Sequence, residues 1–352
     1  MSIDGRSVEV IGQSAFASLE LISVSLPNSI RFIEENAFVF NHLTKINIPG
    51  TIAEIQRAAF QNNRLTHVNI ADGVQVIGGS AFYGNPITDL KLPRTLKIIG
   101  NAAFASNNLS SLTIPSSVVS IENSAFAYST SLKKVTFLGN ELKEIGPYAF
   151  YESQLDEVIL PEGLERISGA AFTRNSLKKV IIPNSVKEIG DSVFVGNNLV
   201  EVIVGDGVTE IPADAFRHNQ IRTLRLGKAV EKIAWGAFAE NEIETLILPN
   251  SLKKIDTLAF NRNKISNIVF GNSLIHIDSQ AFVSNKLKQI YFPDNLAIVG
   301  WNAFGDNDLE LIKIGANVYF SEHENISNFV EIYQATKSAG IYRKDGETWI
   351  KD

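Results

Sequence analysis

The chain has 352 residues, a formal net charge of −6, 45% hydrophobic residues and no cysteine. The lack of cysteine excludes disulfide bonds and cysteine-bound metals. Acidic and basic residues are evenly mixed, which argues against nucleic acid as a partner because phosphates need a concentrated basic surface. No apolar run reaches about 18 residues, so we expect no insertion into a membrane.

The first regular feature along the chain is a phenylalanine that returns at a fixed interval. Fourteen phenylalanines follow one another every 22 residues, apart from one interval of 24 residues between Phe126 and Phe150. A period of this length is typical of a solenoid, in which each repeat is one coil. We therefore predict a solenoid of about 14 coils over residues 1–318. The series is Phe16, Phe38, Phe60, Phe82, Phe104, Phe126, Phe150, Phe172, Phe194, Phe216, Phe238, Phe260, Phe282 and Phe304.

Each coil contains one apolar alternation and one apolar pair. In the coil after Phe60, Val68 and Ile70 stand eight and ten residues after the phenylalanine, a spacing that predicts one short parallel strand per coil. A Pro or Gly then ends the strand in most coils. The apolar pair that follows, such as Val186 and Ile189, predicts a return segment. The Ala-Phe segment is expected to form a short helical turn on the outer side.

An asparagine stands three residues after the phenylalanine in eleven coils. Stacking would place these amides above one another, where each can bond backbone groups of the next coil. We predict an asparagine ladder beside a spine of stacked phenylalanine rings. The coil with the 24-residue interval has Ser129 at the ladder position, and the next coil has Ser153. We interpret its two extra residues as a tolerated insertion; a bulged contact loop is the alternative.

The repeat fades after Ile314, and the remaining residues resemble a cap. Residues 328–337 have the apolar spacing of one amphipathic helix, which Gly340 would close. Asp345-Gly346 lies between two short β-prone runs and predicts a hairpin. Because a solenoid needs its last coil covered, we predict a C-terminal cap over residues 319–352. A small binding module is the alternative.

The outward positions of the strands change character along the chain. Nine residues after the phenylalanine, or ten in the coil after Phe126, the first six coils have Ser25, Asn47, Asn69, Lys91, Thr113 and Thr136. The following coils have Ile159, Ile181, Ile203, Arg225, Ile247, Val269 and Tyr291. We predict that this apolar stripe, about 30 Å long, binds a partner on the concave strand face, with Arg222 and Arg225 as hydrogen-bond donors. The alternative is that β-branched residues favour strands whichever way they point.

Two tryptophans, Trp235 and Trp301, share one repeat position on the outer side. We expect each to pack over a neighbouring coil, with a role as a binding anchor as the alternative.

The repeat unit resembles a known family. Residues 177–197 read L-x-x-V-x-I-P-x-S-V-x-x-I-G-x-x-V-F-x-x-N, which is similar to the BspA-like leucine-rich repeat family over about residues 8 to 318. The resemblance implies a right-handed leucine-rich-repeat solenoid of the α/β class. It also implies a bacterial surface or secreted protein that binds host proteins or other cells, without enzymatic activity in the repeats. The family often has Cys at the position where this chain has Asn.

The sequence contains no recognisable catalytic, cofactor-binding or metal-binding motif. Its five histidines occupy different repeat positions, so stacking does not gather them. We therefore predict a non-enzymatic protein-binding scaffold at the cell surface or secreted; the alternative is a structural stalk or self-associating element. An enzyme in the C-terminal segment would need a cleft with convergent polar groups. Residues 1–6 have no secretion signal, so we expect a leader to be missing from this chain; a cytoplasmic location and the oligomeric state stay open.

Overall fold

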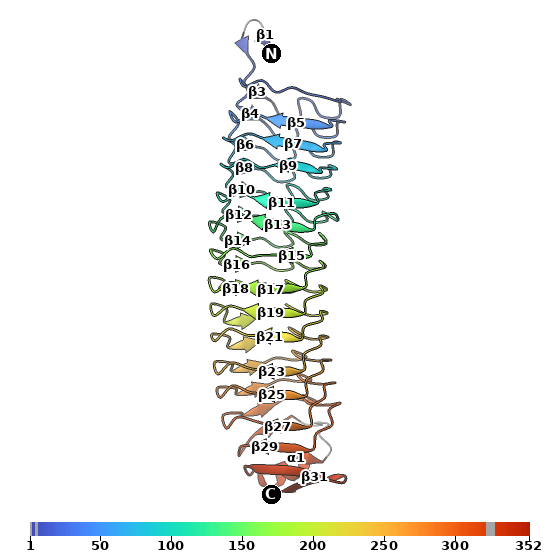
Figure 1. Ribbon diagram of the computed structural model, residues 1–352, viewed down its shortest axis with the longest axis vertical. Coiled ribbons are helices and arrows are strands. Elements are labelled where there is room, and N and C mark those ends of the chain that lie inside the picture. The colour runs from blue at the N-terminus through green and yellow to red at the C-terminus, as the bar shows by residue number, and fades with distance from the viewer. Residues whose placement is uncertain (1, 4–5, 322–327) are drawn as a thin grey trace. The chain divides into compact units, whose positions relative to one another are not determined.

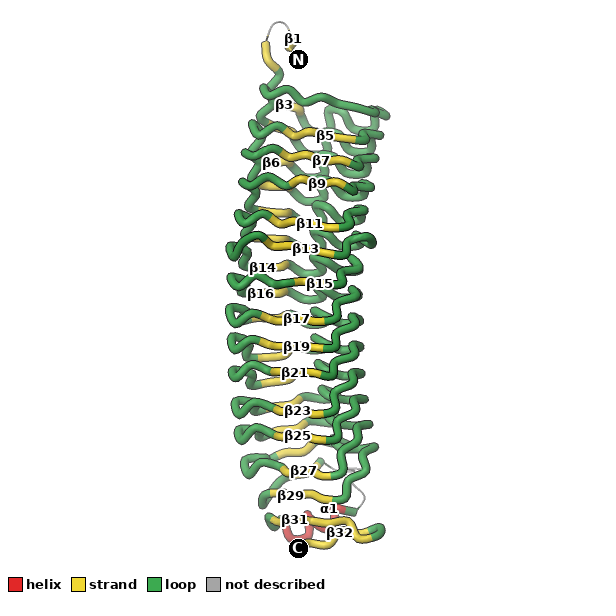
Figure 2. The backbone as a smooth tube through the Cα atoms, in the orientation of Figure 1, coloured by secondary structure: helices red, strands yellow, loops and turns green. Residues whose placement is uncertain are grey.

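Each 22-residue repeat forms one coil of a parallel-strand solenoid in the computed structural model (Figure 1). The structure describes residues 2–3, 6–321 and 328–352. Its contacts divide the chain into two units, Met1–Leu177 and Lys178–Asp352. Except in the coil after Phe16, which lacks the first strand, each coil has two short strands separated by loops, as the yellow and green segments of Figure 2 show. We call the first strand after each phenylalanine a face strand and the second a return strand.

The first unit contains six face strands in two parallel sheets of three strands each. Equivalent residues pair from coil to coil, for example Ile46 with Val68 inside and Asn47 with Asn69 outside. The face strands are β5 (Lys45–Ile48), β7 (His67–Ile70), β9 (Asp89–Lys91), β11 (Ser111–Ile114), β13 (Lys134–Phe137) and β15 (Glu157–Val158).

The return strands of the first unit pair in parallel from one coil to the next. They are β3 (Val10–Ile11), β4 (Phe32–Ile33), β6 (Glu54–Ile55), β8 (Val76–Ile77), β10 (Ile98–Ile99), β12 (Ser120–Ile121), β14 (Glu144–Ile145) and β16 (Arg166–Ile167). Before them, β1 (Ser2–Ile3) and β2 (Arg6–Ser7) form an antiparallel pair.

The second unit repeats this arrangement. Its face strands are β17 (Lys179–Ile182), β19 (Glu201–Val204), β21 (Thr223–Arg225), β23 (Thr245–Ile247), β25 (Asn267–Val269), β27 (Gln289–Tyr291) and β29 (Leu311–Ile314). Its return strands are β18 (Glu188–Ile189), β20 (Glu210–Ile211), β22 (Lys232–Ile233), β24 (Lys254–Ile255), β26 (His276–Ile277), β28 (Ile298–Val299) and β30 (Tyr319–Phe320).

The return strands were not predicted, because the sequence pattern indicated only one strand per coil. Each has two residues, of which the second points inward; Ile55 and Ile255, for example, are fully buried. A segment this short shows no alternation that a sequence pattern could reveal. It forms because its backbone groups find partners at the equivalent residues of the adjacent coil.

The segment around each phenylalanine is a pair of tight turns, so the predicted helical turn is wrong. At Phe38, the N–H groups of Ala37 and Val39 donate to carbonyls three residues earlier in the same coil. The N–H groups of Asn36, Phe38 and Phe40 instead donate to carbonyls of the next coil. Asn36 also has φ of 57°, outside the right-handed helical region. Every second N–H group, which in a helix would donate to a carbonyl of its own segment, therefore donates to the adjacent coil instead.

The phenylalanine rings form the predicted stack within each unit. Ring centroids of adjacent coils lie 5.2 Å apart for Phe82 and Phe104 in the first unit, and 5.2 Å apart for Phe216 and Phe238 in the second. The planes of these two pairs deviate by 5° and 2°. From Phe38 onward every ring of the series is buried, so each coil contributes one aromatic side chain to a continuous stack in the core.

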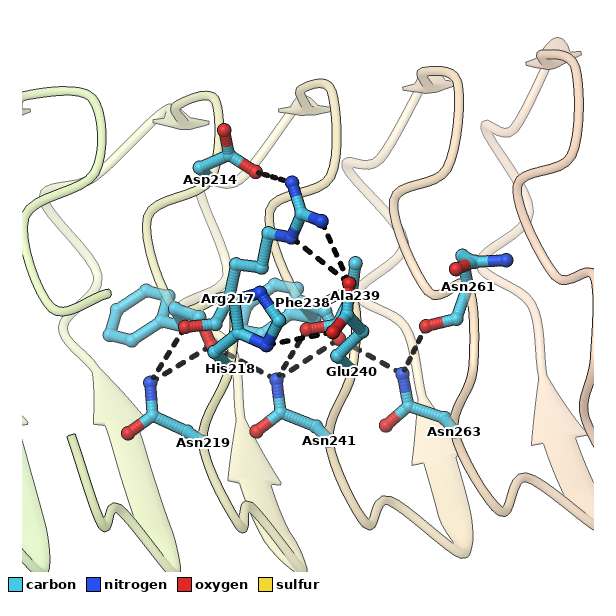
Figure 3. Close-up of polar contacts among 11 residues, drawn as sticks. Asp214, Arg217, His218, Asn219, Phe238, Ala239, Glu240, Asn241, Asn261 and Asn263 are labelled. Carbon is cyan, nitrogen blue, oxygen red and sulfur yellow. Dashed lines mark hydrogen bonds and ion pairs between the residues drawn. The ribbon is translucent and has the colours of Figure 1, made fainter. Parts of the chain in front are cut away.

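The asparagine ladder is also confirmed, with its bonds directed to the preceding coil as well as to its own. Asn241 donates through Nδ2 to the carbonyls of Phe216 (2.9 Å) and Phe238 (3.1 Å), and its Oδ1 accepts the N–H of Ile221 at 3.1 Å. Figure 3 shows Asn219, Asn241 and Asn263 repeating this pattern. Each amide thus satisfies backbone groups that stacking removes from water.

The predicted helix and hairpin at the C-terminal end are both present. α1 (Phe329–Thr336) precedes β31 (Gly340–Asp345) and β32 (Thr348–Lys351), and β31 pairs antiparallel with β29. Buried Tyr333 donates its hydroxyl to the carbonyl of Gly315 at 2.7 Å, which ties the helix to the last coils. Residues 322–327 of the predicted cap lie outside the described residues, and its boundary at residue 318 stays a prediction.

Candidate functional site

The candidate site of the second unit is a row of outward side chains on its face strands. In β17, Ile181 is 49% exposed whereas Val180 and Ile182 on either side are buried, as strand alternation requires. The register aligns Ile181 with Ile203 and Arg225. We call the set the strand row; it comprises Ile181, Ile203, Arg225, Ile247, Val269, Tyr291 and Lys313.

Three consecutive coils of the strand row carry no charge on their outward face. Ile247, Val269 and Tyr291 are 65%, 51% and 48% exposed. The outward residue two positions earlier in each strand is polar but neutral, namely Thr245, Asn267 and Gln289. We call these six residues the uncharged patch. The centres of protein interfaces are depleted of charge and enriched in aromatic residues such as tyrosine, so this patch has the composition of a contact surface.

The two predicted arginine donors have different surroundings. Arg222 forms an ion pair with Glu242 at 2.8 Å, and Lys264 reaches the same carboxylate at 3.0 Å. Hydrogen bonds from Lys264 and Arg222 lower the pKa of Glu242. Arg225 is exposed and, among the described residues, its guanidinium has no ion-pair partner. Both arginines border a shallow cavity of about 380 Å³ that Ile247 also lines, so the two donors are distinguished by the pairing of Arg222 with Glu242.

Ile159, the first residue of the predicted stripe, belongs to the first unit. It is 73% exposed, and it lines a groove of about 410 Å³ together with Leu138, Phe137 and Pro161. Leu138 is 63% exposed and comes from the loop that holds one of the two extra residues. The loop with the extra residue therefore contributes to a groove that apolar and polar side chains line together, and its role as a contact loop stays a prediction.

A charged cluster lies on the turns of the second unit, on a different side of the coil from the face strands (Figure 3). Glu240 accepts Arg217 and His218, each at 2.7 Å, and Arg217 Nη1 lies 3.5 Å from Asp214 Oδ1. Burial raises the pKa of the Asp214 carboxyl. The Arg217 guanidinium also lies over the ring of Trp235, 5.7 Å from its centroid, as the predicted packing between coils requires. Glu240 thus holds Arg217 in an ion pair, and the side chain of His218 beside it is 52% exposed.

Among residues 2–3, 6–321 and 328–352, no group of three or more His, Asp or Glu side chains is arranged to hold a metal ion. Over the same described ranges, no helix has the length and hydropathy needed to cross a bilayer.

Comparison with known proteins identifies the repeat. The model of the BspA-type leucine-rich repeat region matches residues 2–110, 97–222 and 209–329. No curated protein matches the chain. A leucine-rich repeat protein from Bacteroides ovatus has a similar structure, with a TM-score of 0.64 and 23% identity over 90% of this chain and 88% of that chain.

Two further solved structures match with lower scores. The pneumococcal vaccine antigen PcpA has a TM-score of 0.44 and 23% identity over 90% of this chain and 71% of that chain. A leucine-rich repeat protein from Eubacterium ventriosum has a TM-score of 0.46 and 17% identity over 86% of this chain and 81% of that chain. The likeness to the Bacteroides protein is the one that supports the leucine-rich-repeat fold.

Proposed function

Because the chain belongs to the BspA-type leucine-rich repeat family, we propose that it is a non-enzymatic protein-binding scaffold whose second unit contacts the partner through the strand row. Leucine-rich repeats generally serve as scaffolds for protein interactions. The observation that supports this site most directly is the uncharged patch, where three exposed apolar side chains stand on a regular, buried framework. Such a framework is preorganised, so binding costs little backbone entropy.

The location of the scaffold is part of the same proposal. BspA-like proteins are typically exposed on bacterial surfaces or secreted, and we infer that this chain acts there, as an adhesion or interaction module. The alternative, a structural element that associates with itself, would use the same patch. Light scattering of the purified protein separates the two roles, because a stable oligomer that buries the patch would support self-association.

The decisive experiment changes the patch without changing the coils. Ile247 and Val269 are direct neighbours in β23 and β25, so Ile247→Asp with Val269→Asp would place two charges at the centre of the patch. The matched control is Asn47→Asp with Asn69→Asp, which are neighbours at the same repeat position in the first unit. The wild type and the two variants are each immobilised and incubated with extracellular host protein extract, and the bound proteins are identified and quantified.

We expect the second-unit variant to lose its specific partner and the first-unit control to keep it. Both variants should keep the circular dichroism and the thermal unfolding of the wild type, because all four positions are outward. Equal capture by the wild type and the second-unit variant would contradict the strand row as the contact site.

A further inference from the structure

The uncharged patch lies between two basic residues of the strand row. Arg225 and Ile247 line one cavity at one end of the patch, and Lys313 pairs in register with Tyr291 at the other end. Arg225 and Lys313 are four coils apart in the repeat. With strands spaced about 4.8 Å apart, the two cations are about 20 Å from each other.

Several other basic residues around the face strands of the second unit have a carboxylate partner. Lys179 pairs with Glu201 at 2.8 Å, Lys288 with Glu310 at 3.2 Å, and Arg222 with Glu242. Among the described residues, neither Arg225 nor Lys313 has a carboxylate within ion-pair distance. In a chain with a net charge of −6, the strand row therefore has, within the described part of the chain, two positive charges without an ion-pair partner at the ends of a neutral surface.

We propose that the partner presents a segment with an uncharged, partly apolar centre and a carboxylate at each end, about 20 Å apart. This inference rests on the proposed function, because it assigns the chemistry of the partner to the same strand row. The centre would cover Ile247, Val269 and Tyr291, and the carboxylates would receive charge-assisted hydrogen bonds from Arg225 and Lys313. An extended segment of about six residues or a helix of about 13 residues spans this distance.

Charge also argues against a second copy of this chain as the occupant. A symmetric dimer centred on the patch with its two rows aligned would have its two-fold axis in the plane of the interface, either along the row or across it. The first arrangement places Arg225 against Arg225 of the other copy, and the second places Arg225 against Lys313. Both bring like charges together, which opposes association and selects for an acidic partner.

The test uses a displayed library of random peptides of about 15 residues, long enough to span the patch as a helix. The library is selected on the full-length wild type, on Arg225→Glu with Lys313→Glu, and on Ile247→Asp with Val269→Asp. A control, Lys187→Glu with Lys286→Glu, makes the same change in net charge at exposed positions outside the strand row. Selected peptides are sequenced and their affinities are measured at low and high salt.

We expect the wild type to select peptides with an uncharged centre and acidic residues on both sides. The charge-reversed variant should bind these peptides at least about tenfold more weakly and select basic flanks instead, whereas the Lys187 and Lys286 control should bind like the wild type. High salt should weaken wild-type binding.

The outcomes distinguish a failure of the inference about the partner from a failure of the proposed contact site. If the variant with Ile247→Asp and Val269→Asp loses binding but the selected peptides show no acidic flanks, the inference about the partner fails and the proposed contact site stands. If the selected peptides bind this variant as well as the wild type, the proposed contact site fails, and the inference fails with it. A selection that yields no binding peptide also overturns the inference, because it requires that a linear segment fits the patch.

Discussion

The outward strand residues of the two units differ although their interiors are built in the same way. Asn47, Asn69 and Thr113 stand where the second unit has Ile181, Ile247 and Val269. Both units stack phenylalanines at nearly the same spacing and satisfy the coil backbone with an asparagine ladder. The buried positions therefore define the coil, and the outward positions are free to differ between the units.

This difference also weakens the explanation of the isoleucines by strand propensity. Asparagine is a poor strand former. Even so, Asn47 and Asn69 lie in the four-residue strands β5 and β7, which pair over their full length. Inter-coil pairing and the buried Ile and Val residues are sufficient to form a face strand. Since the second unit does not need exposed isoleucine for its strands, these side chains have the properties expected of a contact surface.

The largest effect should come from the phenylalanine stack and should be equal in both units. Phe82→Ala in the first unit and Phe260→Ala in the second each remove a fully buried ring between two stacked neighbours. We expect each to lower the free energy of unfolding by about 3–5 kcal/mol, because the cavity cannot be refilled. Urea unfolding followed by circular dichroism measures both. A large loss in one unit and none in the other would show that the interiors are not equivalent.

The ladder should give the next largest effect. Asn85→Ala and Asn241→Ala each leave three carbonyls and one N–H without the amide that bonds them. We expect each to cost about 3 kcal/mol of unfolding free energy, since unsatisfied buried polar groups are expensive. Ser129→Ala is the matched control, because Ser129 holds the same repeat position but its buried hydroxyl has no hydrogen-bond partner among the residues that the structure describes. That change should be close to neutral, and a large loss there would show that the inserted coil depends on the hydroxyl.

Exchanging the outward residues should change stability least among the structural substitutions. Ile247→Asn gives the second unit a residue type of the first, and Asn69→Ile does the reverse. Because both positions are exposed, we expect unfolding free energies within about 0.5 kcal/mol of the wild type. Ile247→Asn should nevertheless weaken partner binding, and Asn69→Ile should not. Destabilisation by more than about 1 kcal/mol would mean that the isoleucines serve the fold.

The repeat made much of the fold predictable. Phenylalanine and asparagine return at one interval, so a single stacking assumption places the ring spine, the ladder and the face strands. The helix α1 and the hairpin at Asp345-Gly346 follow from local signals that depend on few distant contacts.

Features that depend on inter-coil geometry were not predictable. The residue two positions before each phenylalanine has positive φ, yet it is Tyr148 in one coil and Leu258 in another, so no glycine signature marks the turn. The ion pair of Arg222 depends on Glu242, whose carboxylate reaches it from the adjacent coil. The groove at Leu138 depends on how the extra residues are accommodated. Sequence spacing identified Arg222 and Arg225 as a pair, but only side-chain geometry separates them.

The smallest effect concerns Asp214, an acidic residue of the second unit at a repeat position that does not require a charge. Asp214 has φ of 53° and stands where the first unit has residues such as Ser80 and Ala102. Burial raises the pKa of its carboxyl, and nearby Arg217 partly opposes this shift. The native state therefore binds the proton more tightly than the unfolded chain, so this group makes stability fall as pH rises above the ordinary Asp pKa of 3.8.

Asp214→Asn removes this titration, and Asn tolerates the left-handed backbone at this position. Arg217 keeps Glu240 as its partner at 2.7 Å, so the substitution leaves no isolated charge. We expect the stability of the variant relative to the wild type to increase from pH 4 to pH 7, with urea midpoints at both values as the measurement. If the relative stability instead decreases, the attraction of Arg217 outweighs the burial of the carboxylate. The charge of Asp214 would then stabilise its turn, whereas the equivalent turns of the first unit form with uncharged residues.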